Sequence, residues 1–126
     1  MTSDAAQTAI EAAITGVGRP LEGVRVLSME QAAALPFATR HLADLGAEVI
    51  RIEAPGRASR TVGVDLFRNK RRVALDLSQP AGPEAFCRIA SYCDIVAHNF
   101  TPRVMRKFGI DSQVSRRCAT TSSTCR

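Results

Sequence analysis

A helix and a strand follow one another in Pro36-Phe37-Ala38-Thr39-Arg40-His41-Leu42-Ala43-Asp44-Leu45-Gly46-Ala47-Glu48-Val49-Ile50-Arg51-Ile52-Glu53, the stretch that decides the fold. Proline suits the first turn of a helix, and apolar side chains recur at helical spacing from there to Gly46, a natural helix end. The residues from Glu48 onward alternate as in a strand, which Pro55-Gly56 ends. The stretch therefore predicts a helix beside a strand, the repeating unit of an α/β protein.

The segments on either side continue this alternation. Further strands are predicted at residues 24–27, 72–77 and 94–98, and further helices at residues 84–92 and 102–109. A short helix from Asp4 to Ile14 precedes them. The order of these elements predicts an α/β domain with a mostly parallel sheet and flanking helices.

A sheet of this kind binds ligands beyond the carboxyl ends of its strands. In this sequence those ends are Ser28–Ala34, Glu53–Gly56, Asp76–Ser78 and His98–Thr101. We therefore expect a ligand site to be built from these four segments.

The composition is that of a globular domain, with 45% hydrophobic and 23% charged residues in 126. Residues 1–50 carry 3 basic and 6 acidic side chains and residues 51–126 carry 14 and 6, so the two parts have net charges of −3 and +8, which sum to +5. The basic part, with its run Arg68-Asn69-Lys70-Arg71-Arg72, favours an anionic partner such as nucleic acid or a phosphate-bearing cofactor. A solvated face with a basic tail is the alternative.

Neither a metal site nor a membrane span is indicated. The cysteines are Cys87, Cys93, Cys118 and Cys125. Their spacing is not that of a zinc site, and neither His41 nor His98 completes one, so we expect reduced thiols and no metal. We find no secretory signal and no apolar run long enough for a membrane span, and therefore expect a cytoplasmic protein.

Four blocks of the sequence together resemble family III CoA-transferases. These blocks are residues 20–27, 36–53, 69–77 and 94–102, and the resemblance extends over residues 20–113. It implies a Rossmann-like N-terminal part of a longer chain, which would be a homodimer acting on an acyl-CoA. In that case coenzyme A is a substrate, no cofactor is tightly bound, and neither nucleic acid nor a membrane is a partner.

The resemblance also implies which residues contact coenzyme A. By their match to the family they are Ala33, Ala34, Ala54, Leu75, Asp76, Leu77, Ser78, Asn99, Phe100, Lys107 and Phe108. The sequence departs from the family at Leu35, where members usually have glycine, and at Ser28, where aspartate is common. Ala54 and Ser78 also stand where members can offer a basic side chain.

Catalysis in this family uses an aspartate nucleophile, and in its racemase branch a His/Asp pair. Both would lie beyond residue 126, so we assign no catalytic residue and expect the chain to retain only part of the coenzyme A site. Three alternatives stay open: an acyl-CoA racemase of the same fold, a non-enzymatic basic binding module, and an inactive truncated product.

The chain divides into three parts on these grounds. Residues 1–19 form an N-terminal extension, residues 20–113 the partial family domain, and residues 114–126 a tail without apolar periodicity. Out-of-frame translation of a longer gene would explain this tail, and a genuine tail is the other explanation. A parallel sheet that lacks its remaining strands is expected to expose an open edge and apolar surface.

Overall fold

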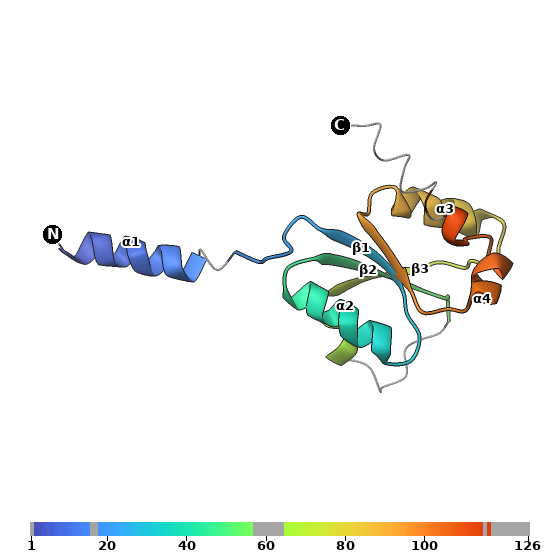
Figure 1. Ribbon diagram of the computed structural model, residues 1–126, viewed down its shortest axis with the longest axis horizontal. Helices are drawn as coiled ribbons and strands as arrows, with labels where there is room; N and C mark the ends of the chain where they lie inside the picture. The colour runs from blue at the N-terminus through green and yellow to red at the C-terminus, as the bar shows by residue number, and fades with distance from the viewer. Residues whose placement is uncertain (1, 16–17, 57–64, 115, 117–126) are drawn as a thin grey trace.

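The computed structural model describes residues 2–15, 18–56, 65–114 and 116, and shows a small sheet with helices on both of its faces (Figure 1). Its elements in chain order are α1 (Thr2–Thr15), β1 (Arg25–Met29), α2 (Ala34–Asp44), β2 (Glu48–Glu53), the 3₁₀ turn η1 (Asp65–Phe67), β3 (Lys70–Ala74), α3 (Ala81–Ala90), β4 (Ile95–His98) and α4 (Pro102–Lys107).

The four strands form one sheet in the order β3-β2-β1-β4, and every neighbouring pair is parallel. The chain moves outward from β1 through β2 to β3 and then returns to place β4 on the other side of β1. This reversal is the topological switch point at which open α/β sheets bind ligands. The predicted fold class, an α/β protein with a parallel sheet and flanking helices, is confirmed.

One face of the sheet packs against α3 and α4. Leu27 and Met29 of β1 point to this face, where they meet Phe86 of α3 and Met105 of α4 in one buried cluster. Phe86 is fully buried and is the largest side chain of that cluster. The cluster fixes α3 and α4 beside the carboxyl ends of the strands.

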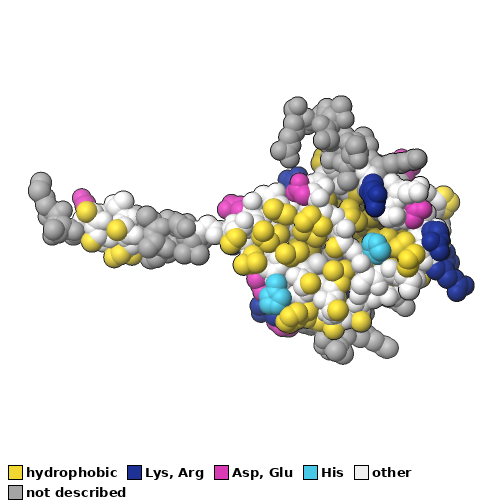
Figure 2. All heavy atoms as spheres, in the orientation of Figure 1, with side chains coloured by type: hydrophobic (Ala, Val, Ile, Leu, Met, Phe, Trp, Pro, Cys, Tyr) yellow, Lys and Arg dark blue, Asp and Glu magenta, His cyan; other side chains and the backbone are white. Residues whose placement is uncertain are grey.

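The other face packs against α2. Val26 of β1 and Val49 of β2 lie under Ala43 and Ala47 and form a second, smaller cluster. Figure 2 shows hydrophobic side chains spread over the visible surface of the domain. Among the large hydrophobic side chains that remain exposed are Phe37, Leu45, Tyr92 and Ile95. The expected exposure of apolar surface is therefore present in the described residues.

The predicted elements all form, with small shifts of their ends. The third strand covers Lys70–Ala74 and not residues 72–77. Its basic first residues pair with β2, whereas the more apolar residues after Ala74 lie beyond the end of the paired strand. The first strand covers Arg25–Met29 and so continues two residues beyond the predicted range 24–27. The strand at Glu48–Glu53 has the predicted bounds.

Two sequence expectations outside the sheet have different outcomes. The N-terminal helix forms as α1, apart from the sheet in Figure 1. The expectation of reduced thiols holds at Cys93, which is free and buried, but is wrong at Cys87, which is disulfide-bonded. Cys118 and Cys125 lie outside the described residues, as does all of the tail except Val114 and Arg116.

Candidate functional site

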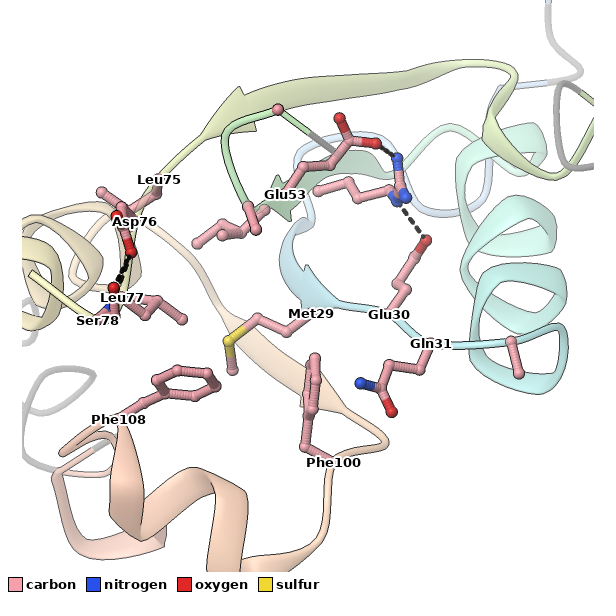
Figure 3. A pocket seen from close by; sticks show the side chains of 15 residues that line it. Met29, Glu30, Gln31, Glu53, Leu75, Asp76, Leu77, Ser78, Phe100 and Phe108 are labelled. Carbon is pink, nitrogen blue, oxygen red and sulfur yellow. Dashed lines mark hydrogen bonds and ion pairs between the residues drawn. The ribbon is translucent and has the colours of Figure 1, made fainter. Parts of the chain in front are cut away.

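A cleft of about 1010 Å³ opens at the carboxyl ends of the strands, on the edge that the parallel topology predicts. Segments from four parts of the chain meet there (Figure 3). The lining residues are Met29, Glu30, Gln31, Ala32, Arg51, Ile52, Glu53, Ala54, Gly56, Leu75, Asp76, Leu77, Ser78, Phe100 and Phe108.

One wall of the cleft is apolar. Met29 at the end of β1 lies between Phe100, which follows β4, and Phe108, which follows α4 (Figure 3). Leu75 and Leu77 extend this wall after β3. All of these side chains pack on the buried cluster below α3, so the wall is supported by the core. Such a surface suits the uncharged arm or aromatic base of an elongated ligand.

The opposite wall is charged and largely buried. Arg51 of β2 lies between Glu30, 3.2 Å from Nε to Oε2, and Glu53, to which it is bound by a second ion pair. The side chains of Glu30, Arg51 and Glu53 are 0%, 11% and 9% exposed. The guanidinium of Arg51 also stacks on the ring of Phe67, 3.7 Å from its centroid. Burial lowers the pKa of Arg51 from its ordinary value, and the neighbouring Glu30 opposes that shift.

Lys70 holds Glu30 of this wall in place without lining the cleft itself. Its ammonium donates to both oxygens of Glu30, at 3.0 and 3.2 Å, to the hydroxyl of Thr39 at 2.7 Å and to the carbonyl of Pro36 at 2.8 Å. Ser28 and Thr39 also donate to Glu30. Lys70 is 1% exposed, and this burial lowers its pKa although Glu30 opposes the shift. The buried pair therefore ties α2 and β3 to the loop after β1.

The basic run 68–72 is satisfied by carboxylates in the described structure. Lys70 pairs with Glu30, as above, and the arginines pair with acidic residues of α2, η1 and β2. These pairs are Arg68 with Asp44 and Asp65, Arg71 with Glu48, and Arg72 with Glu53. The run is therefore part of a network of ion pairs around β3.

The loop after β3 is closed by a local hydrogen-bonded turn. Asp76 Oδ1 accepts from the hydroxyl of Ser78 at 2.5 Å and from its backbone N–H at 2.9 Å. These two bonds hold the pKa of Asp76 below its usual value, the hydroxyl bond being the larger cause. The carboxylate is therefore committed to the turn while its neighbours line the cleft.

Replacing Ser78 by alanine is expected to raise the pKa of Asp76, because the stronger of its two donors is lost. Since Asp76 has a lowered pKa in the folded state, it adds stability above the ordinary aspartate pKa of about 3.9, and this stability is lost as the pH falls through its folded pKa. An NMR titration of the Asp76 carboxyl carbon in both chains measures the shift. An unchanged pKa would contradict the assigned cause.

The structure brings most of the sequence-predicted contact residues into the cleft and leaves others outside it. Those that line it are Ala54, Leu75, Asp76, Leu77, Ser78, Phe100 and Phe108. Ala33 and Ala34 do not line it, since they begin α2, and the preceding residues Gln31 and Ala32 stand in the wall instead. Lys107 ends α4 with its side chain exposed, and Asn99 is exposed and is not among the lining residues.

The sequence analysis did not predict the charged wall. Glu30, Arg51 and Glu53 fall in or beside segments that the strand-end rule marked, but no pattern singled out their side chains. The signal that marks them is spatial, since the Lys70 that binds Glu30 lies 40 residues further along the chain.

Two features are absent from the described residues. No group of three or more His, Cys, Asp or Glu residues within them is placed to hold a metal ion. Nor does any helix in this part of the chain have the length and apolar character needed to cross a membrane.

The strand order and the cleft together define an open, Rossmann-like α/β domain with its site at the switch point. The model of CoA-transferase family III matches residues 21–119. The chain belongs to CoA-transferase family III.

Characterised relatives agree with this assignment. The human succinyl-CoA:glutarate CoA-transferase is 35% identical over 105 residues, which cover 73% of this chain and 24% of the relative. The succinyl-CoA--D-citramalate CoA-transferase of Chloroflexus aurantiacus is 36% identical over 105 residues, which cover 73% and 26%. The chain therefore spans about a quarter of the length of these relatives.

Solved structures give the same result. The crystal structure of Rv3272 from Mycobacterium tuberculosis superposes with a TM-score of 0.72 at 38% identity, over 80% of this chain and 30% of that one. A CAIB/BAIF family protein from Brucella suis gives a TM-score of 0.69 at 30% identity, over 79% and 30%. A short chain dehydrogenase/reductase family protein shares the fold alone, at 17% identity and a TM-score of 0.54.

Proposed function

We propose that this chain forms the part of a CoA-transferase that binds the coenzyme A portion of an acyl-CoA. The observation that carries the proposal is the cleft of about 1010 Å³ at the switch point of the sheet, built by residues within the family match. The relatives named above are transferases of CoA, which supports coenzyme A as the ligand class.

The chemistry of the cleft suits coenzyme A. Its pantetheine arm and adenine base are large and uncharged, and the wall formed by Met29, Phe100 and Phe108 offers them an apolar surface. The net charge of +8 carried by residues 51–126 favours the approach of a ligand with several phosphates.

The reaction proposed for the complete enzyme proceeds through an aspartyl intermediate. An enzyme carboxylate attacks the thioester carbonyl and the C–S bond breaks. Coenzyme A leaves as a thiolate, and a mixed anhydride of the enzyme carboxylate and the donor acid remains. The thiolate then attacks the enzyme-side carbonyl, which frees the donor acid and forms an enzyme–CoA thioester. The acceptor carboxylate then attacks the enzyme–CoA thioester, which releases the thiolate and forms a second mixed anhydride. The thiolate attacks the acceptor-side carbonyl of this anhydride, which gives the new acyl-CoA and restores the enzyme carboxylate.

None of the carboxylates that line the described cleft is available as this nucleophile. Glu30 is held by Lys70, Glu53 by Arg51 and Asp76 by Ser78, as described above. We therefore assign the nucleophile to none of them and expect this chain to bind coenzyme A without turnover.

Calorimetry with coenzyme A tests the proposal. We expect a dissociation constant of about 0.1–1 mM, equivalent to about 4–5.5 kcal/mol of binding free energy, because the chain supplies only part of a site. Phe108→Ala should weaken binding, whereas Tyr92→Ala, 73% exposed and outside the cleft, should leave it unchanged.

Two outcomes would contradict the proposal. Label exchange between acetyl-CoA and a free carboxylate, catalysed by the chain, would show that it carries its own nucleophile. Binding of random duplex DNA more tightly than coenzyme A, with a steep dependence on salt, would instead favour a basic nucleic-acid-binding module.

A further inference from the structure

Asn99 uses both ends of its side-chain amide on one backbone segment, that of Gln31. Its Oδ1 accepts from the N–H of Gln31 at 2.8 Å, and its Nδ2 donates to the carbonyl of Gln31 at 2.7 Å. The two residues are 68 positions apart in the sequence. The pair of bonds therefore joins the turn after β4 to the loop after β1.

The segment held in this way is unusual in its backbone. Ala32, the next residue, has a φ of 54°, in the left-handed region that L-residues other than Asn and Asp rarely adopt. Conformations of this kind persist where the surrounding structure enforces them. The amide of Asn99 is a group in contact with this loop that can enforce it.

The location of the loop connects this geometry to the site. Gln31 and Ala32 both line the cleft, whereas Asn99 does not. Figure 3 shows Gln31 beside Phe100, the residue that follows Asn99. A change in the backbone at Ala32 would therefore move the wall of the cleft directly.

We propose that Asn99 is a positioning residue, which holds the Gln31–Ala32 wall in its left-handed conformation and so acts on the ligand through that wall without touching it. The part of this proposal that concerns coenzyme A rests on the proposed function. The part that concerns the loop does not, since it is a property of the free chain.

The first arm of the test needs no ligand. In Asn99→Ala the backbone ¹³C shifts and coupling constants of Ala32, which report the sign of φ, should lose their left-handed signature. Asn69→Ala is the matched control, because Asn69 binds Asp44 away from the cleft and its removal should leave the Ala32 signals unchanged. Unchanged Ala32 signals in Asn99→Ala would overturn the proposal.

The second arm measures coenzyme A affinity. Asn99→Ala should weaken binding about tenfold, because only a minor part of the population then has the competent wall. Adding Ala32→Gly should recover affinity to within about threefold of the original chain, since glycine adopts positive φ without the penalty of a β-carbon. The affinity of Ala32→Gly alone is measured alongside, so that any effect of glycine on the wall itself is taken into account.

The outcomes separate this proposal from the proposed function. Loss of affinity in Asn99→Ala with no rescue by Ala32→Gly would mean that Asn99 contacts the ligand itself, and would overturn the positioning role. Absence of coenzyme A binding by the unmodified chain would contradict the proposed function, while the NMR arm would still decide whether Asn99 holds the loop.

Discussion

Replacing Lys70 by methionine is expected to lower the free energy of unfolding by about 3–5 kcal/mol. Methionine matches the length of the lysine stem, so packing is nearly preserved and what is lost is the amine with its hydrogen bonds to Glu30, Thr39 and Pro36. Glu30, which is 0% exposed, would then lie under α2 with one of its two cationic partners gone. A loss of this size is comparable with the whole stability of many small domains, which is about 5–15 kcal/mol.

Urea denaturation followed by circular dichroism measures this loss. Arg71→Met is the matched control, because Arg71 is the neighbour of Lys70 on β3 and pairs with Glu48, but is 77% exposed. Exposed pairs of this kind contribute about 0–1 kcal/mol. An equal, small effect of both substitutions would refute the view that the buried pair holds α2 and β3 together.

A double substitution tests whether the loss of stability comes from leaving a buried charge without its partner or from changing the side chain at residue 70. Glu30→Leu combined with Lys70→Met removes both charges of this pair, while Arg51 keeps its ion pair with Glu53. The double variant should recover much of the stability, since a buried ion pair and an apolar pair of similar volume are often equally stable. The single substitution Glu30→Leu should be as harmful as Lys70→Met, because it leaves the ammonium without its carboxylate.

The pH dependence of stability provides an independent check. Burial holds the pKa of Lys70 below its ordinary 10.5, so the unfolded chain binds this proton more tightly than the folded chain. Stability must therefore rise with pH between the folded-state pKa and 10.5, as the folded chain is relieved of its buried charge. Lys70→Met should lose this part of the alkaline dependence.

The fold was accessible from sequence because its signals are local. The alternation from Glu48 to Glu53 and the helix before it are readable within one window, and they gave correct bounds for β2. The third strand was misplaced because Lys70 is polar at a position where the pattern demands an apolar residue. Its aliphatic stem and its partner Glu30 make that position compatible with burial, and neither is visible in a window of this length.

The apolar wall of the cleft was accessible for a different reason. The strand-end rule named the segments that hold Leu77 and Phe100, and the family resemblance named these two residues together with Leu75 and Phe108. Each of these residues lies at the end of a predicted strand or helix or just after it, so a small error in the element's end does not remove it from the site.

The opposite wall and its supports were not accessible, because they depend on contacts between distant residues. Glu30 and Lys70 are 40 residues apart, and Gln31 and Asn99 are 68 apart. The left-handed backbone at Ala32 also carries no sequence signal, since alanine gives no indication of positive φ where glycine or asparagine would.

Replacing Gly82 by alanine is expected to destabilise the chain by about 2 kcal/mol and to displace the loop that lines the cleft after β3. Gly82 lies in the first turn of α3, where a β-carbon would stand 2.1 Å from the carbonyl oxygen of Asp76 and 2.8 Å from the α-carbon of Leu77. Both atoms belong to the backbone, so neither can rotate away. On helix propensity alone alanine would stabilise α3 by about 1 kcal/mol. Overpacking costs about 1–3 kcal/mol, and a contact of 2.1 Å with a backbone oxygen places the cost at the upper end, about 3 kcal/mol, which leaves a net loss of about 2 kcal/mol.

The displacement should be visible in the cleft as well as in stability. The backbone of Asp76 and Leu77 must move to make room for the β-carbon. Hydrogen exchange at the backbone amides of residues 75–78 should therefore accelerate, and coenzyme A affinity should fall about tenfold. Gly18→Ala is the control, since a β-carbon there meets no atom within 4 Å and its φ is not in the left-handed region. If Gly82→Ala lowers the unfolding free energy but leaves exchange at residues 75–78 and affinity at their original values, α3 has moved as a whole and the loop does not depend on the close approach of its glycine.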